Sequence, residues 1–275
     1  MPRIDHHATL RVLVSVRGHP FDRTAFDRIF SGMDGITATM VDQPAAAQLM
    51  TPEGMVPYDA LVLYDMPGID LTVPPPEGPV PLAPPPALQE GLEALLRAGK
   101  GVVALHHALG GWPAWEAYAG WLGGRFLYRP GLLGGAQRPD SGYRHEVSQT
   151  VTVATDHPVT AGLPPSFRLV DELYLAEIFE DEVVPLLRSD YRFTRDNFWS
   201  AAAAMEGRLF DNEGWAHPPG PSLLGWAKRA LASPLVYLQP GDGPATYDDP
   251  HYRRLVENAI RWVASPDALA WARSG

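Results

Sequence analysis

Short segments of almost continuous apolar residues recur through the first part of the chain, and most of them contain β-branched side chains. They lie at residues 11–16, 36–41, 60–64 and 101–105. Such runs are typical of strands that are buried on both faces of a parallel sheet. Between them, residues 22–30 and 88–97 have apolar positions at helical spacing. Strands that alternate with helices predict an α/β fold with right-handed crossovers.

The pattern changes further along the chain. Residues 147–154 alternate between apolar and polar positions, as in an antiparallel strand, and residues 184–187 and 235–238 are further short strand candidates. Residues 252–263 have the apolar stripe of an amphipathic helix. We therefore expect a mostly parallel central sheet flanked by helices, with antiparallel strands added to it.

Two segments break this regular pattern. Residues 68–86 are crowded with proline and are predicted to be irregular. Residues 195–220 contain an alanine run, two tryptophans and a Pro-Pro-Gly, and are predicted to form an inserted lobe. Because no linker separates two halves, we expect one domain over residues 11–264, with an N-terminal tail at 1–10 and a C-terminal tail at 265–275.

Composition narrows the functional classes. The formal net charge of −10 and the pI near 5.3 argue against nucleic acid as a partner, because phosphate binding needs a basic surface. No apolar run reaches the length of a membrane helix and no secretory signal is evident, so we expect no membrane association and a cytoplasmic location. The chain has no cysteine, which excludes disulfides and thiolate nucleophiles.

Candidate site residues follow the predicted strands. In open parallel sheets, ligands bind beyond the carboxyl ends of the strands. The loops just past the predicted strands contain His19, Asp65, the pair His106–His107 and Asp242. We therefore expect these side chains to meet in one cleft, with Asp65, His107 and Asp242 as substrate contacts.

His106 stands at a sharp strand-to-helix turn, where hydrolases with a nucleophile elbow expose their reactive residue. An imidazole there can act as a general base or bind a metal ion, and the alternative is a buried structural histidine. His157 is expected to have a structural role in a turn. The remaining histidines are expected at the surface: His6, His7, His145, His217 and His251.

A second candidate group lies at 171–174. Asp171 and Glu172 precede Tyr174, and paired carboxylates suit acid/base chemistry or a metal shell, although they are also typical of a helix start. Trp199 and Trp215 in the inserted lobe are candidates for stacking on a sugar ring. The sequence lacks the glycine-rich nucleotide-binding motifs and the His-Glu-x-x-His motif, which disfavours nicotinamide and ATP chemistry.

Four stretches in order resemble the ThuA-like, trehalose-utilisation family. They are residues 99–108 (GKGVVALHHA), 156–163 (DHPVTAGL), 171–174 (DELY) and 247–262. The resemblance spans roughly residues 11–264 and implies a flavodoxin-like fold similar to that of class I glutamine amidotransferases. It places His106 where those enzymes carry their nucleophilic cysteine, so glutaminase activity is not expected. This chain departs from the family at Asp242, where the family usually has a histidine.

The resemblance also implies a role in carbohydrate metabolism, with a sugar or keto-sugar as the small-molecule partner. We expect an enzyme in which His106 and Glu172 are catalytic and His19, Asp65, His107, Tyr174 and Asp242 contact substrate. A divalent metal such as zinc is a candidate cofactor, with His19, His106 and Asp242 as its ligands. A non-catalytic carbohydrate-binding module and an interaction subunit are the alternatives, and the sequence leaves open whether the chain forms a homo-oligomer.

Overall fold

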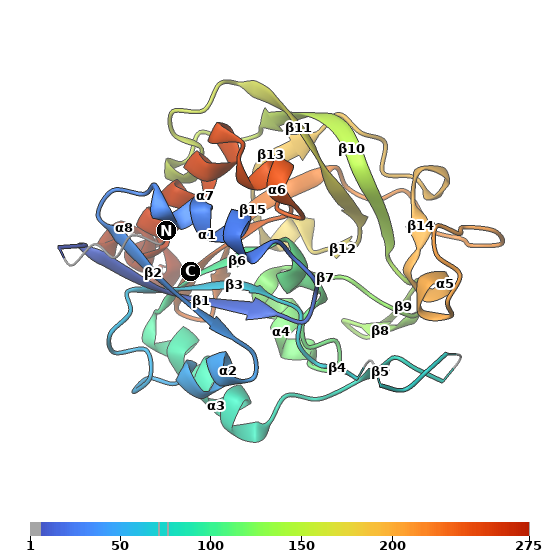
Figure 1. Ribbon diagram of the computed structural model, residues 1–275, viewed down its shortest axis with the longest axis horizontal. Helices are drawn as coiled ribbons and strands as arrows, with labels where there is room; N and C mark the ends of the chain where they lie inside the picture. Colours follow the sequence, from blue (N-terminus) through green and yellow to red (C-terminus); the bar gives the residue numbers. More distant parts are fainter. Residues whose placement is uncertain (1–6, 71, 76, 275) are drawn as a thin grey trace.

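The computed structural model describes residues 7–70, 72–75 and 77–274, and its centre is a ten-stranded mixed sheet (Figure 1). Five adjacent strands run parallel. In spatial order they are β2 (Ile36–Asp42), β1 (Leu10–Arg17), β3 (Ala60–Asp65), β6 (Gly101–Leu105) and β16 (Ser233–Leu238). The predicted mostly parallel centre with helices on both sides is confirmed.

The sheet continues beyond β16 with antiparallel strands. They are β15 (Leu223–Ala230), β13 (Val184–Ser189), β10 (Gly142–Val153) and β11 (Ser166–Leu175) in spatial order, and the short β14 (Trp199–Ser200) also pairs with β10. The added antiparallel strands are therefore also confirmed. Among the described residues there are also three two-stranded sheets, formed by β4 (Ile69–Asp70) with β5 (Val80–Pro81), β7 (Gly124–Arg125) with β12 (Glu177–Ile178), and β8 (Gly131–Leu133) with β9 (Ala136–Arg138).

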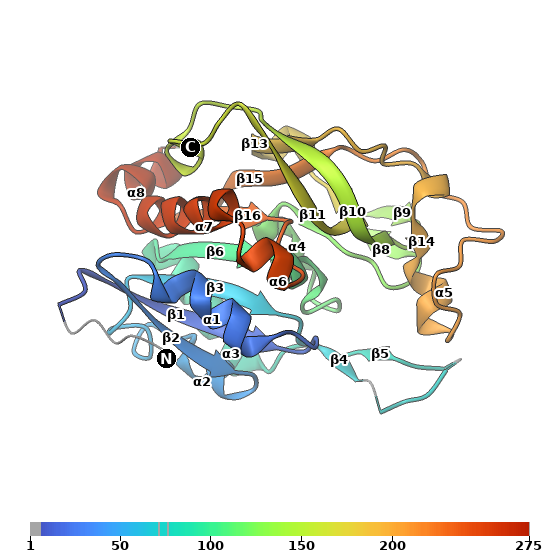
Figure 2. The same cartoon turned by 45° about the horizontal axis from the view of Figure 1, so that its top comes forward.

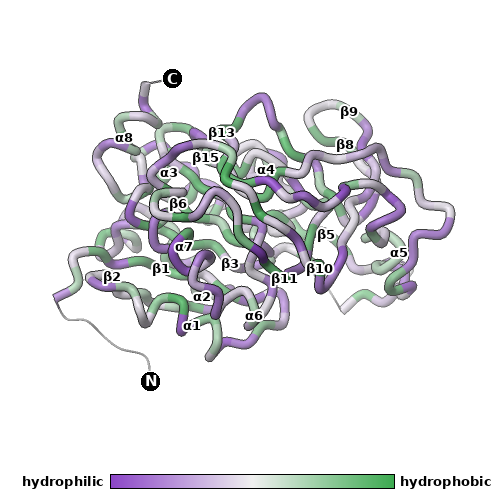
Figure 3. Tube along the Cα trace, turned by 90° about the horizontal axis from the view of Figure 1, so that it is seen from above, coloured by the Kyte–Doolittle hydropathy of each residue, from purple (hydrophilic) through white to green (hydrophobic). Residues whose placement is uncertain are grey.

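Helices cover both faces of the parallel strands (Figure 2). The helices on one side are α1 (Arg23–Ser31), α7 (Pro250–Val263) and α8 (Pro266–Arg273), and those on the other are α2 (Ala45–Leu49), α3 (Pro86–Ala98) and α4 (Glu116–Leu122). Strand β1 shows how the sequence serves both faces. Val12 and Val14 belong to the core under α1 and α7, whereas Leu13 belongs to the core under α3. The hydrophobic character of the central strands is visible in Figure 3.

Several sequence expectations are corrected. The expected C-terminal tail contains α8, whose Ala268 and Ala272 are buried against the core. The proline-rich segment holds the short β4–β5 hairpin, which proline permits because each strand is at an edge. Strands β11 and β15 were not expected, because their apolar positions are interrupted by charged residues such as Arg168 and Lys228.

The inserted lobe is tied to the rest of the chain by a buried carboxylate. It contains β14 and the short helix α5 (Ala201–Met205), which lie at one end of the molecule in Figure 1. Asp140 accepts hydrogen bonds from the Ser200 hydroxyl at 2.6 Å and from the Trp215 indole at 2.9 Å. Trp215 therefore has a structural partner. The described residues include no helix long and apolar enough to cross a membrane.

Candidate functional site

The carboxyl ends of the parallel strands deliver polar side chains to one region, as the topology predicts. His19 follows β1, His106 and His107 follow β6, and Asp242 follows β16. One oxygen of Asp242 lies 3.7 Å from His106 Nε2, and Asp242 also forms a close group with His19 and His107. Asp65 is placed differently. It is buried at the end of β3, where it accepts hydrogen bonds from Ser15 and Gln43, and it does not line the pocket described below.

His106 begins a 3-10 turn (His106–Gly110) directly after β6, and its φ of 35° is rare for a residue with a side chain. The side chain is completely buried. Its Nδ1 donates to the carbonyl oxygen of Gln239, because a carbonyl can only accept. Its Nε2 lies 3.0 Å from a Glu172 carboxylate oxygen and 2.8 Å from the Tyr174 hydroxyl. The imidazole is therefore fixed at both nitrogens.

Glu172 and Tyr174 lie on β11, so they are part of a strand and the alternative of a helix start is wrong. Residues two apart on a strand point to the same face, which brings both side chains against His106. The second oxygen of Glu172 lies 3.1 Å from His145 Nδ1. The carboxylate therefore lies between two imidazoles, one buried and one partly exposed.

The charges of this group reinforce one another. Burial by itself would lower the pKa of His106, but the hydrogen bond and charge of Glu172, with the charges of Asp242 and Asp171, raise that pKa to about 9. Burial would raise the pKa of Glu172, but the hydrogen bond to His106 and the positive charges of His106 and His145 hold it below its usual value. The pair is therefore an imidazolium and a carboxylate at neutral pH.

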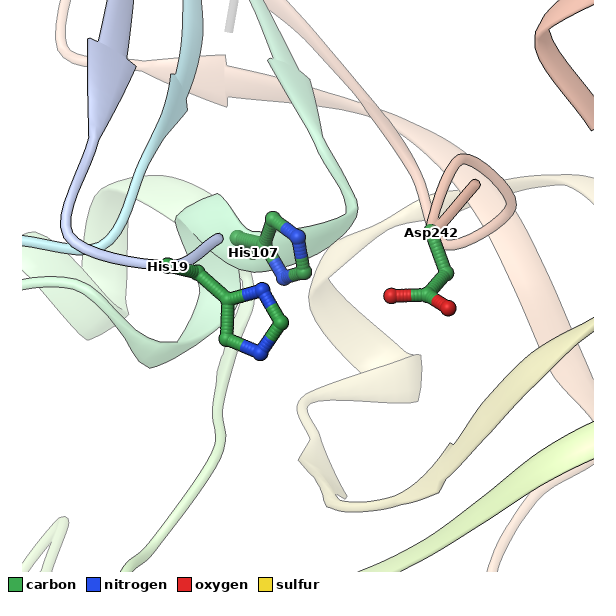
Figure 4. A group of neighbouring side chains, drawn as sticks. All are labelled: His19, His107 and Asp242. Carbon is green, nitrogen blue, oxygen red and sulfur yellow. The ribbon is translucent and has the colours of Figure 1, made fainter. Parts of the chain in front are cut away.

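A second group consists of His19, His107 and Asp242 (Figure 4). One nitrogen from each imidazole and one carboxylate oxygen all lie within 4.8 Å of one another. The two rings are 4.0 Å apart between centroids, and the carboxylate of Asp242 points toward them in Figure 4. Burial and then the neighbouring His106 lower the pKa of both His19 and His107. Of the expected metal ligands, His19 and Asp242 thus belong together with His107, whereas His106 belongs to the Glu172 group.

Both groups border a pocket of about 290 Å³. Glu172, Tyr174, His19, His107 and His145 supply its polar wall. Its apolar wall includes Phe126, Tyr128, Tyr143, Met205 and Phe210, so α5 and the loop that follows it form one side. His106 is not in the wall and lies behind Glu172 and Tyr174.

A wider groove of about 950 Å³ adjoins the pocket, since His145 and Phe210 line both. Asp242 and Trp199 also line the groove, and the guanidinium of Arg144 lies 4.1 Å from the centre of the Trp199 ring. Of the two tryptophans expected to stack on a sugar, Trp199 therefore faces the groove, and Trp215 borders neither hollow.

Three residues of the site were missed or misjudged from the sequence. His145 is exposed, as expected, but its contact with Glu172 was missed, and this contact lies where the pairing of β10 with β11 has a bulge between Arg144 and Val147. Gln239 is fully buried, and its side chain accepts from the Tyr174 backbone N–H at 2.9 Å. Asp171 accepts hydrogen bonds from the backbone N–H groups of Gly241 and Asp242. The Tyr-Arg-His sequence ahead of the predicted strand at 147–154 was the only available signal for His145.

His157 fulfils its expected structural role. Its Nδ1 accepts from the backbone of Val159, and the Thr160 hydroxyl accepts from the His157 backbone, so the two residues form a capping box.

Solved structures share this fold. A putative ThuA-like protein from Parabacteroides merdae superposes with a TM-score of 0.64 at 14% identity, covering 93% of this chain and 90% of that one. A putative ThuA-like protein from Bacteroides uniformis gives a TM-score of 0.58 at 18% identity, covering 95% and 94%. PurLQS from Thermotoga maritima gives 0.51 at 11% identity, covering 92% and 98%. The fold is that of class I glutamine amidotransferases, as expected.

Sequence comparison identifies the family. No curated protein matches the chain. The family model ThuA, described as trehalose utilisation, matches residues 12–263 and so spans both candidate groups. Because that match covers nearly the whole chain, the protein belongs to the ThuA family.

Proposed function

We propose that this protein is an enzyme of carbohydrate metabolism that transfers a proton to or from a sugar or keto-sugar, with Glu172 as the group that carries the proton. The observation that carries the proposal is the placement of Glu172. It is a carboxylate in the wall of a small pocket, with one oxygen 3.0 Å from His106 and the other 3.1 Å from His145. A carboxylate fixed in this way has one orientation toward a bound molecule, as general acid/base catalysis requires.

The pocket suits a single sugar ring. Its volume of about 290 Å³ is at the low end for small-molecule sites. Aromatic side chains such as Phe126 and Phe210 offer flat apolar surfaces to the carbon face of a ring, and Glu172 and Tyr174 face its hydroxyl or carbonyl oxygens. The adjoining groove has room for a second ring, with Trp199 in its wall.

His106 then has a different role from the one expected. Since it is fully buried behind Glu172 and Tyr174, it orients them and balances the carboxylate charge without contacting the substrate. In an enolisation, Glu172 would remove a proton from the carbon beside a carbonyl, and the electron pair would move to the carbonyl oxygen. The absence of cysteine supports the expectation that the protein does not hydrolyse glutamine.

Turnover of a panel of aldoses, ketoses and keto-glycosides, followed by ¹³C NMR, tests the proposal. The parent should convert at least one compound. Glu172→Gln, which keeps the side-chain volume, should lose at least about 100-fold in rate, since general acid/base catalysis contributes about 10²–10⁴-fold. Glu180→Gln is the matched control, because that carboxylate forms an ion pair with Arg188 and borders neither hollow. Binding without turnover in the parent, or equal rates for both variants, would refute the proposal.

The cytoplasmic location and the absence of nucleic-acid and membrane partners stay predictions of the sequence.

A further inference from the structure

The group formed by His19, His107 and Asp242 has the composition of a metal site. Two imidazoles and one carboxylate are a common ligand set of catalytic zinc, which leaves the fourth position to water or substrate. The three residues come from three separate loops, yet their donor atoms lie within 4.8 Å of one another. No hydrogen bond joins any two of them among the described residues, and the contact between the two imidazole rings leaves the approach of the Asp242 carboxylate without a bonded partner in the group.

The hydrogen bonds of the two imidazoles leave nitrogen lone pairs available. His19 Nδ1 lies 2.9 Å from the carbonyl oxygen of Pro20, which can only accept, so Nδ1 carries the proton and Nε2 the lone pair. His107 Nδ1 lies 3.4 Å from the Tyr174 hydroxyl. His107 Nε2 is buried and has no hydrogen-bond partner among the described residues. A buried polar atom without a partner destabilises the fold, and a bound ion would supply the missing partner.

The second group of possible ligands, His106, Glu172 and Asp242, is a poorer metal site. His106 Nδ1 is hydrogen-bonded to the Gln239 carbonyl oxygen, and its Nε2 already contacts both Glu172 and Tyr174. Its side chain is fully buried, which leaves no space for water or substrate on an ion. His19, His107 and Asp242 differ in this respect, because the two histidines line the pocket and Asp242 lines the groove.

We propose that His19, His107 and Asp242 bind one divalent transition-metal ion, zinc being the best match, at the junction of the pocket and the groove. Bonds of about 2.0–2.2 Å in a tetrahedral site put ligand atoms about 3.4 Å apart, so donor atoms at the 4.8 Å limit would approach one another by about 1.4 Å on binding. Asp242 is 30% exposed and can rotate to supply this movement. Mixed nitrogen and oxygen ligands disfavour magnesium and calcium, which prefer oxygen alone.

An ion at this site could assist the proposed reaction, but its binding does not require that the proposed reaction is correct. His19 and His107 line the same pocket as Glu172, so an ion held by them would be able to polarise a carbonyl or hydroxyl oxygen of a sugar there. This role rests on the proposed function. The ion's binding does not, because it is measured without substrate.

Calorimetric titration with zinc chloride, after removal of metal by a chelator and dialysis, tests the site. The parent should bind one zinc ion per chain at this site. Asp242→Asn and His19→Gln should each weaken that binding at least about 100-fold, since loss even of a residue that supports a ligand costs about 10–100-fold. His217→Ala should bind as the parent does, because His217 borders neither hollow.

Cobalt(II) gives a second readout. Bound at this site, it should produce the intense visible absorption of a tetrahedral ion in the parent and in His217→Ala, and lose it in Asp242→Asn. Circular dichroism of each variant establishes that it is folded, and His19→Gln replaces Asp242→Asn as the deciding variant if the latter is not. Absence of binding by the parent, or binding that both site variants retain, would overturn the proposal. If the parent binds zinc at this site but Glu172→Gln turns over substrate as fast as the parent, the proposed function is refuted and the metal site is not.

Discussion

Asp171 holds the loop that carries Asp242, and replacing it with asparagine should weaken both the fold and the site. The carboxylate is buried on β11. One oxygen accepts from the Gly241 N–H at 2.6 Å, and the other accepts from the N–H groups of Asp242 at 3.1 Å and of Glu172 at 3.0 Å. Asp171 thus joins the two groups of the site through backbone hydrogen bonds.

The magnitude follows from the number of acceptors. Asparagine of the same shape has one oxygen, so its amide N–H₂ must face either Gly241 N–H or the other two donors. At least one backbone N–H is then left buried without an acceptor, and the remaining bonds lose their charge. Hydrogen bonds to charged groups contribute about 1.5–3 kcal/mol, and we therefore expect Asp171→Asn to lower the free energy of unfolding by about 2–4 kcal/mol.

Chemical denaturation followed by circular dichroism measures this loss. Asp190→Asn is the matched control, because Asp190 is exposed and its hydrogen bond from the Thr150 N–H, at 2.8 Å, can be kept by an amide oxygen. It should change the free energy of unfolding by less than about 0.5 kcal/mol. The same protein samples should show weaker zinc binding for Asp171→Asn, because the loop of Asp242 is released. If Asp171→Asn unfolds like Asp190→Asn, the carboxylate does not hold the loop and the reasoning fails.

Two further substitutions probe the pocket and the groove separately. Gly110→Ala would place a Cβ 2.4 Å from the hydroxyl of Tyr128, which lines the pocket, so this side chain must shift and ligand binding, measured by calorimetry, should weaken. Gly120→Ala, with nothing within 4 Å of the new Cβ, should leave binding unchanged, and equal affinities for the two variants would contradict this packing. Trp199→Leu should weaken the binding of a two-ring sugar about 2- to 12-fold and leave the binding of a one-ring sugar unchanged. This factor corresponds to the roughly 0.5–1.5 kcal/mol that an aromatic contact contributes. If Trp199→Leu weakened the binding of one-ring sugars by the same factor, the assignment of the first ring to the pocket and the second to the groove would be wrong.

The parallel half of the sheet was predictable because its strands are buried on both faces. Strand β6 is a run of buried apolar residues, and this alone located His106 at its carboxyl end. The same rule placed His19 and Asp242 at the same edge. Strand β11 was not predictable, because it alternates exposed and buried residues over its first half and carries two buried carboxylates near its end.

The detailed site depends on geometry that the sequence does not encode locally. Which of the neighbouring histidines His106 and His107 faces the pocket is decided by the positive φ of His106 at the turn. The contact of His145 with Glu172 depends on a bulge in β10 and on the pairing of β10 with β11. Asp65 was expected to contact substrate but lies outside the pocket. It follows a strand as the rule requires, but Ser15 and Gln43 on the neighbouring segments bind it below the surface.

Hydrogen–deuterium exchange at the carbon beside the carbonyl of a bound keto-sugar tests the central claim most directly. In D₂O, an enzyme whose carboxylate removes that proton exchanges it even when no product accumulates. NMR should show the proton signal disappear faster with the parent and with Glu180→Gln than in the protein-free solution, and at the protein-free rate with Glu172→Gln. Exchange that Glu172→Gln catalyses as fast as the parent would contradict the assignment of Glu172 as the proton-transferring group.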